Sequence, residues 1–120
     1  MIILYKSKNM TSRLFEKVTL SNKVEVPGLL VKAPLTLFSS NPEGSISEGE
    51  RNYIKSSAIG VGMYILGTTA EAQDGFCFPG NPHEISEKDL PTLEERAKII
   101  KSQGALAINQ IHHAGALALK

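Results

Sequence analysis

The chain has 120 residues, of which 42% are hydrophobic and 21% charged, and its 13 basic residues nearly balance 12 acidic ones. This is the composition of an ordinary globular protein, and it excludes disordered, collagen-like and coiled-coil chains. The near-neutral charge and the scattered basic residues argue against a nucleic-acid or membrane partner. No apolar run approaches the roughly 18 residues that span a bilayer.

The single cysteine, Cys77, cannot form an internal disulfide and fits a reducing compartment. The apolar start Met1–Tyr5 is too short for a signal peptide, and Lys6 follows it at once. We therefore expect a cytoplasmic protein with a flexible arm over residues 1–14 and one folded unit over residues 15–120.

The first folded element is predicted to be a β-hairpin over Phe15–Val26, where apolar and polar residues alternate. Asn22 lies in its turn and is a residue that tolerates the left-handed backbone of tight turns. After Pro27-Gly28, the mostly apolar run Leu29–Leu35 has the length of a strand. Such runs are typical of strands buried on both faces, as in a parallel sheet.

A helix is expected after a loop over residues 36–46. Ser47 and Glu50 have the spacing of a capping box, in which both side chains satisfy free amides at a helix start. Gly60 lies where a glycine would end that helix. Val61–Leu66 then predicts a second buried strand.

A second helix is expected to start at Ser86 and Asp89, with Pro91 in its first turn and Gly104 at its end. Ala105–Ile111 is the third apolar run. The charged residues of the helix are interpreted as a solvated face: Glu94, Glu95, Arg96 and Lys98.

The alternation of strands and helices predicts an α/β fold with a parallel sheet. The strand starts at residues 29, 61 and 105 suit a (β/α)8 barrel, which uses about 30 residues per unit. A doubly wound fold is equally compatible with this order. Gly60-Val61-Gly62 does not identify a dinucleotide loop, because these glycines precede a strand and do not open a helix.

We expect no metal site. His112 and His113 are adjacent on a predicted strand, so their side chains point to opposite faces, and His83 lies apart in a loop. One of the adjacent histidines is expected to face a site and the other to pack or form a hydrogen bond.

Small and polar residues gather where the three predicted strands end, in Ala33–Thr36, Gly67–Thr69 and Asn109–His113. Ligands bind at this end of the strands in barrels and in open α/β sheets alike. On the residues alone, Thr36 and Gln110 are explained more simply as groups that satisfy strand-end backbone.

At these segments the sequence resembles the old yellow enzyme family, the FMN-dependent NAD(P)H:flavin oxidoreductases and 2,4-dienoyl-CoA reductases. The similarity runs from Leu14 onward and follows the order of the family. It is carried by the following segments: Leu14–Leu20, Lys32–Thr36, Gly60–Gly62 with Thr68–Ala70, Gly75–Gly80 with Ile85-Ser86, and Gln110–Gly115. The resemblance implies that residues 15–120 are a partial FMN-binding TIM (β/α)8 barrel: the opening hairpin, the first three strands and two helices.

The resemblance also implies a set of cofactor-binding residues: Ala33, Pro34, Leu35, Thr36, Thr68 and Gln110. The first three would lie against the flavin ring. The Thr36 hydroxyl would lie near the N5/O4 edge, where protein groups tune the flavin potential. Thr68 would take a position beside the flavin that is usually held by alanine or glycine, and Gln110 would pair its amide with the pyrimidine edge.

Three departures from the family pattern accompany this resemblance. Gly67 stands where an acidic residue is common, and Ala116 stands where arginine usually follows Ala-Gly. The family's catalytic and phosphate-binding groups belong to later strands, so we expect no catalytic residue within this chain and no activity from the chain alone.

The function implied is that of the N-terminal part of an FMN-dependent oxidoreductase. It would pass hydride from NAD(P)H through FMN to a small-molecule acceptor such as an activated alkene, and it could be a homo-oligomer. Two alternatives stay open: a non-enzymatic α/β binding or interaction module, and a doubly wound nucleotide-binding domain, which the misplaced glycines disfavour.

Overall fold

The computed structural model describes residues 13–119, which contain a small hairpin and a parallel sheet. Strand β1 (Val18–Thr19) pairs antiparallel with β2 (Glu25–Val26). Strands β3 (Val31–Lys32), β4 (Met63–Ala70) and β5 (Leu106–His112) form the parallel sheet, with β4 in the centre. Residues 1–12 of the expected arm lie outside the described residues.

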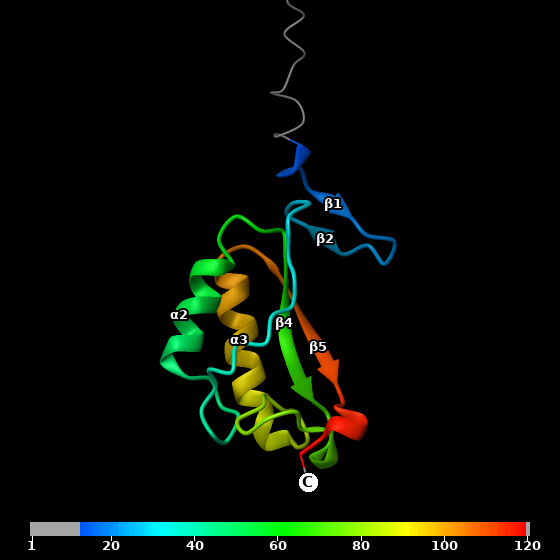
Figure 1. Cartoon of the computed structure of the whole chain (residues 1–120). Coiled ribbons are helices and arrows are strands. Elements are labelled where there is room, and N and C mark those ends of the chain that lie inside the picture. The colour runs from blue at the N-terminus through cyan, green and yellow to red at the C-terminus, as the bar shows by residue number, and fades with distance from the viewer. Residues whose placement is uncertain (1–12, 120) are drawn as a thin grey trace, which may run out of the picture.

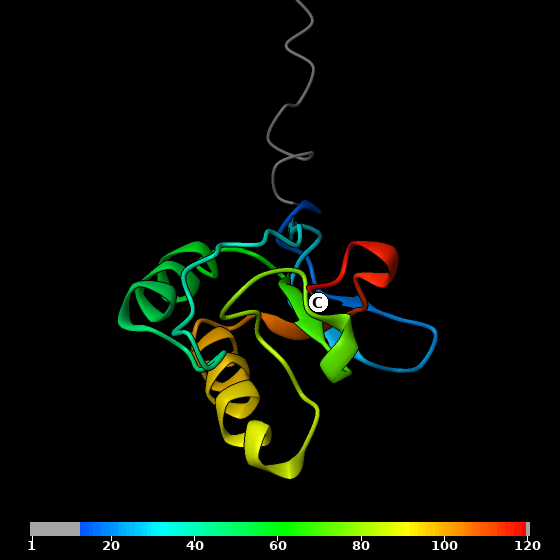
Figure 2. The same cartoon turned by 60° about the horizontal axis from the view of Figure 1, so that its bottom comes forward.

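Helices α2 (Glu48–Ser57) and α3 (Leu90–Ser102) both lie on one side of this sheet (Figure 1). The described residues also include three 3-10 turns: η1 (Gln73–Gly75), η2 (Glu87–Asp89) and η3 (Gly115–Leu117). The hairpin lies at the end where β4 and β5 begin, whereas η3 lies at the end where they finish (Figures 1 and 2). No helix within residues 13–119 has both the length and the apolar character needed to cross a membrane.

The helix boundaries follow from local capping. The Oγ of Ser47 accepts a hydrogen bond from the Glu50 amide at 3.1 Å, and Ser86 and Asp89 form a complete capping box. Gly104, with φ of +88°, follows α3 as expected. The predicted capping box at α2 is only half correct, because the Glu50 carboxylate turns to a different partner described below.

The hairpin turn differs from the prediction in one residue. Lys23, with φ of +67°, takes the left-handed backbone that we expected at Asn22. The Asn22 side chain instead accepts a hydrogen bond from the amide of Val24 at 3.2 Å. Asparagine commonly forms turns through its side chain in this way, which leaves the positive φ to the next residue.

The hydrophobic core lies between the sheet and the two helices. Ile54 of α2, Ile100 of α3 and Tyr64 of β4 are at most 3% exposed. The rest of the buried cluster comprises Ile46, Ala58, Leu66 and Ala105. We call this side of the sheet the helix-covered face.

The opposite side, which we call the open face, carries none of the helices of residues 13–119 (Figure 1). Along each strand, the side chains of the open face alternate with those of the core. The register places Val31, Met63 and Leu106 side by side on the open face, followed by Ile65 and Ile108. Val31 is 43% exposed, although it belongs to a strand of a parallel sheet.

The prediction that Leu29–Leu35 is a strand buried on both faces is therefore wrong. Only Val31–Lys32 is paired as strand, and Leu29 and Leu35 are 48% and 53% exposed. Within residues 13–119, no strand pairs with the outer edge of β3 and no element covers the open face. Three strands cannot close on themselves, so the described sheet is open and is not a closed barrel.

A β-bulge interrupts β4 near the end of the sheet. The register pairs Ile65 with Ile108 but then Thr68 with Gln110, so β4 has one residue more than β5 in this interval. The extra residue reverses the alternation, and Thr68 joins the face that also carries Gln110. Gly67 lies within the bulge, as is common for glycine in strands.

Candidate functional site at the ends of the parallel strands

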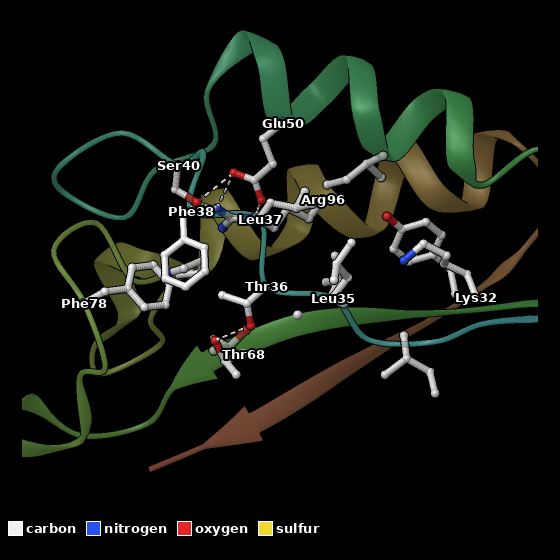
Figure 3. Close-up of a pocket in the computed structure, with 17 residues that line it drawn as sticks. Lys32, Leu35, Thr36, Leu37, Phe38, Ser40, Glu50, Thr68, Phe78 and Arg96 are labelled. Carbon is white, nitrogen blue, oxygen red and sulfur yellow. Dashed lines mark hydrogen bonds and ion pairs between the residues drawn. The ribbon is translucent and has the colours of Figure 1, made fainter. Parts of the chain in front are cut away.

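Polar side chains from three neighbouring segments meet at the end of the sheet where its strands finish, which we call the C-terminal edge. Thr36 follows β3, Thr68 lies on β4 and Gln110 lies on β5. Thr68 and Gln110 are paired in the register, so their side chains share a face, and the Oγ1 atoms of Thr36 and Thr68 are 3.4 Å apart (Figure 3). The structure thus brings together three residues that the sequence placed in one site.

The remaining predicted residues, Ala33, Pro34 and Leu35, lead into Thr36 and are exposed. They form an apolar segment beside the hydroxyl groups. The segment after β3 lies unusually close to β4 here. A Cβ atom built on Gly67 would lie only 2.5 Å from the carbonyl oxygen of Leu35. Only glycine at position 67 permits this approach.

These residues fit the edge of a flat heteroaromatic ring such as the flavin. A separation of 3.4 Å is long for a bond between two hydroxyls, which usually lie about 2.7–2.8 Å apart, so both retain hydrogen-bonding capacity. Within residues 13–119, the amide of Gln110 makes no hydrogen bond, and it offers both a donor and an acceptor. A ring edge with alternating N–H and C=O groups matches this set.

The cavity behind Thr36 is too small for a ligand of the size of a flavin. It has a volume of about 30 Å³ and lies between the segment after β3, the sheet and the two helices (Figure 3). That volume holds a water molecule, whereas ligand pockets measure roughly 300–1,000 Å³. A ligand that contacts Thr36, Thr68 and Gln110 together would have to lie on the exposed side of the C-terminal edge.

A buried ion pair anchors the helices behind this cavity. Arg96 of α3 donates to Glu50 of α2 from Nε at 2.7 Å and from Nη2 at 3.1 Å (Figure 3). Arg96 also donates to the Gly44 carbonyl at 3.1 Å, and Ser40 donates to Glu50 at 2.9 Å. The pair therefore holds α2, α3 and the loop after Thr36 together.

The interpretation of Arg96 as part of a solvated helix face is wrong, since this residue is only 3% exposed. One signal in the sequence could have identified it. Arg96 precedes the buried Ile100 by four residues, so both lie on the same face of α3. Glu94 and Lys98, in contrast, are exposed as predicted.

Two other titratable groups near the sheet form hydrogen bonds within the chain. Burial raises the pKa of the Tyr64 phenol, which stays neutral and shares a hydrogen bond with Ser57 at 3.1 Å. His113 accepts from the Gly115 amide at Nδ1, so its Nε2 carries the hydrogen that faces Asp74 at 3.3 Å. No group of three metal-ligating side chains is present in residues 13–119.

A parallel sheet with helices on one face and polar groups at its C-terminal edge is the arrangement found in α/β barrel proteins. A comparison with known families makes the assignment specific. The sequence model of the NADH:flavin oxidoreductase / NADH oxidase family matches residues 13–119. The chain belongs to this family, which confirms the resemblance noted from its motifs.

Individual relatives support the assignment and show how much of them the chain spans. It is 38% identical over 102 residues to the probable NADH-dependent flavin oxidoreductase YqiG of Bacillus subtilis, a match that covers 85% of this chain and 27% of that protein. It is 28% identical over 107 residues to the NADH:acrylate oxidoreductase of Vibrio harveyi, covering 89% of this chain and 11% of that protein. The chain thus spans about a quarter or less of these relatives.

Solved structures confirm the fold. The old yellow enzyme of Pichia sp. AKU4542 matches with a TM-score of 0.78 at 19% identity, over 88% of this chain and 28% of that one. Morphinone reductase in complex with tetrahydroNAD matches with a TM-score of 0.76 at 18% identity, with the same coverage of both chains. The sheet and helices described above are therefore a part of the old yellow enzyme barrel, as the sequence predicted.

Proposed function

We propose that this chain forms the N-terminal part of an FMN-dependent oxidoreductase that takes hydride from NAD(P)H and passes it to a small-molecule acceptor. The observation that carries the proposal is the convergence of Thr36, Thr68 and Gln110 beside the exposed segment Ala33–Leu35, in a chain of this family. These are the residues that the resemblance assigns to flavin binding.

The acceptor that we propose is an alkene activated by a neighbouring carbonyl or carboxylate. Two relatives support this choice through their names, an NADH:acrylate oxidoreductase and the NADH:fumarate oxidoreductase of Klebsiella pneumoniae, which is 31% identical over 108 residues. Acrylate and fumarate both carry a carbon–carbon double bond conjugated to a carboxylate. Withdrawal of electrons by that group makes the double bond a hydride acceptor.

Each residue of the edge has a separate role in this proposal. FMN, when bound, supplies the atom that accepts and donates hydride. The segment Ala33–Leu35 offers apolar surface and backbone to one face of the ring, and the Gln110 amide holds the pyrimidine edge. Thr36 directs its hydroxyl to the edge whose charge changes on reduction.

The groups that bind the FMN phosphate and the substrate carbonyl are expected in strands beyond the three described here. The phosphate is the group of the cofactor that can form the strongest charged hydrogen bonds with a protein. We therefore expect the chain alone to retain FMN weakly or not at all, and to oxidise NAD(P)H no faster than free FMN does. We also propose a cytoplasmic location, which the single Cys77 supports, and self-association of the chain through its open face.

Purification of the complete enzyme, in which the remaining strands accompany this chain, tests the proposal. We expect a yellow protein with stoichiometric FMN and NAD(P)H-dependent reduction of an activated alkene. A colourless complete enzyme would instead favour the alternative of a non-enzymatic binding module. Steady-state turnover with tightly bound FMN on a monomer of this chain alone would contradict the proposal that further strands bind the FMN phosphate and the substrate carbonyl.

A further inference from the structure

The contact between Thr36 and Thr68 is a feature for which the family resemblance assigns no role. The small residues usual at position 68 have no hydroxyl, whereas this chain places the Thr68 Oγ1 atom 3.4 Å from that of Thr36 (Figure 3). Within the described part of the chain, each of these hydroxyls has a hydrogen-bond contact only with the other. Thr68 can therefore influence Thr36 directly.

Gly67 supplies a second, independent observation about the same contact. A Cβ atom at this position would lie 2.5 Å from the Leu35 carbonyl oxygen and 3.3 Å from the Cα of Thr36. Real Cβ atoms do not approach backbone oxygen to 2.5 Å. The absence of a side chain at Gly67 thus allows the segment that carries Thr36 to lie against β4, within reach of Thr68.

We propose that Thr68 is a positioning residue for the Thr36 hydroxyl, and that Gly67 allows the two to meet. This inference rests on the proposed function, because it concerns the direction in which Thr36 presents its hydrogen to the flavin. A hydroxyl has one donor and two acceptor sites and rotates freely when it is alone. A neighbouring hydroxyl that donates to Thr36 leaves the Thr36 hydrogen free to point to the ligand.

The expected consequence is a change in reduction potential more than in affinity. A donor aimed at the N5/O4 edge stabilises the reduced, more electron-rich ring more strongly than the oxidised ring. Donation by Thr68 also polarises the Thr36 hydroxyl and strengthens it as a donor. Loss of the Thr68 hydroxyl should therefore weaken binding of the reduced flavin relative to the oxidised flavin and lower the midpoint potential.

The test measures the midpoint potential of bound FMN in the complete enzyme for Thr68→Val, which replaces the hydroxyl by a methyl group of similar size. We expect about a threefold change in the ratio of reduced to oxidised affinity, equivalent to about 14 mV for a two-electron couple. The shift should be absent when Thr68→Val is introduced into a Thr36→Val background, and Thr68→Ser should restore the wild-type potential. Thr19→Val, an exposed substitution in β1, is the matched control and should leave the potential unchanged.

A measurement without flavin covers the case in which a variant loses its cofactor. In the FMN-free complete enzyme, NMR couplings that report the χ1 angle of Thr36 should show one rotamer in the wild type and averaging in Thr68→Val. Averaging in Thr68→Ala as well would support the same assignment.

The outcomes separate this inference from the proposed function. Bound FMN with an unmoved potential in Thr68→Val, or a single Thr36 rotamer in the FMN-free variant, overturns the positioning role alone. A shift of equal size in the Thr36→Val background also overturns it, because Thr68 would then act on the flavin directly. A wild-type complete enzyme that binds no FMN overturns the proposed function together with this inference.

Discussion

The two faces of the parallel sheet are made by the same strands but differ in how they are completed. On the helix-covered face, Ile54, Tyr64 and Ile100 are almost fully buried, and the Glu50–Arg96 pair joins the two helices. On the open face, Val31 is 43% exposed. Within the described residues, the helix-covered face of the sheet is therefore fully packed, whereas the open face is left partly exposed.

This difference separates the side chains that determine the stability of the fold from those that would determine ligand affinity. Side chains on the helix-covered face contribute to stability within the chain itself, since their contacts are already made. Side chains on the open face and at the C-terminal edge contribute only when a further element or a ligand is added. Substitutions on the two sides should consequently change different measurements.

The largest effect is expected from the buried ion pair. Arg96→Met leaves the Glu50 carboxylate buried without its partner, and the loss of one partner of such a pair costs about 3–5 kcal/mol of unfolding free energy. Urea unfolding of the chain measures this loss. The double variant Arg96→Met with Glu50→Leu should recover much of the stability, because apolar pairs replace buried ion pairs at little cost. A double variant no more stable than Arg96→Met alone would show that the helices need the charges themselves.

A pair of alanine substitutions compares the two faces directly. Ile100→Ala removes a side chain that is 0% exposed and should reduce the unfolding free energy by about 2–5 kcal/mol. Val31→Ala, at an open-face residue that is 43% exposed, should change it by no more than about 0.5 kcal/mol. Equal losses in thermal or urea unfolding would mean that the open face is already covered, for example by a second copy of the chain.

At the C-terminal edge, Gln110→Leu should affect the ligand and leave the fold intact. The flavin's pyrimidine edge loses its amide partner, so FMN binding to the complete enzyme should weaken by about 1–3 kcal/mol. Fluorescence titration of FMN gives the affinity, and the unfolding free energy of the FMN-free protein provides the control. Unchanged affinity would remove Gln110 from the site.

The smallest effect is expected at the start of α3. Burial raises the pKa of the Asp89 carboxyl, but the hydrogen bonds from Ser86 and the nearby His83 outweigh it and lower the pKa below the ordinary value of 3.8. The stability that these contacts provide is present above pH 3.8 and is lost as the pH falls through the lower folded-state pKa.

Replacement of this carboxylate tests that pH dependence. Asp89→Ala should lose about 0.5–2 kcal/mol at neutral pH, as is usual for a capping residue, and should lose its difference from the wild type in acid. Urea unfolding at neutral pH and at pH 2–3 measures both values. A difference that persists in acid would show that the carboxylate charge is not responsible.

The features that sequence could predict are those decided within a few residues. Ser47, and the Ser86–Asp89 pair, start helices through contacts with their own turn, so local spacing was sufficient to find them. The residues of the C-terminal edge were found through their motifs and their position after each strand. The structure brings Thr36, Thr68 and Gln110 together, while their contact with FMN stays a prediction.

Features that depend on distant partners could not be predicted in this way. Arg96 is buried because Glu50 lies opposite it on another helix, and a local pattern of charges contains no information about that helix. Leu29–Leu35 has the composition of a buried strand, but burial requires neighbours on both sides, and the described residues supply only β4. The apolar run is suited to the complete barrel and not to the part seen here.

The bulge in β4 makes the length of this strand as important as its composition. Before it Ile65 aligns with Ile108, and after it Thr68 aligns with Gln110. If β4 continued with the same residues but without the bulge, Gly67 would lie opposite Gln110 and Thr68 would point toward the helices. During evolution, a hydroxyl at position 68 can therefore be kept at this edge only as long as the extra residue before it stays bulged.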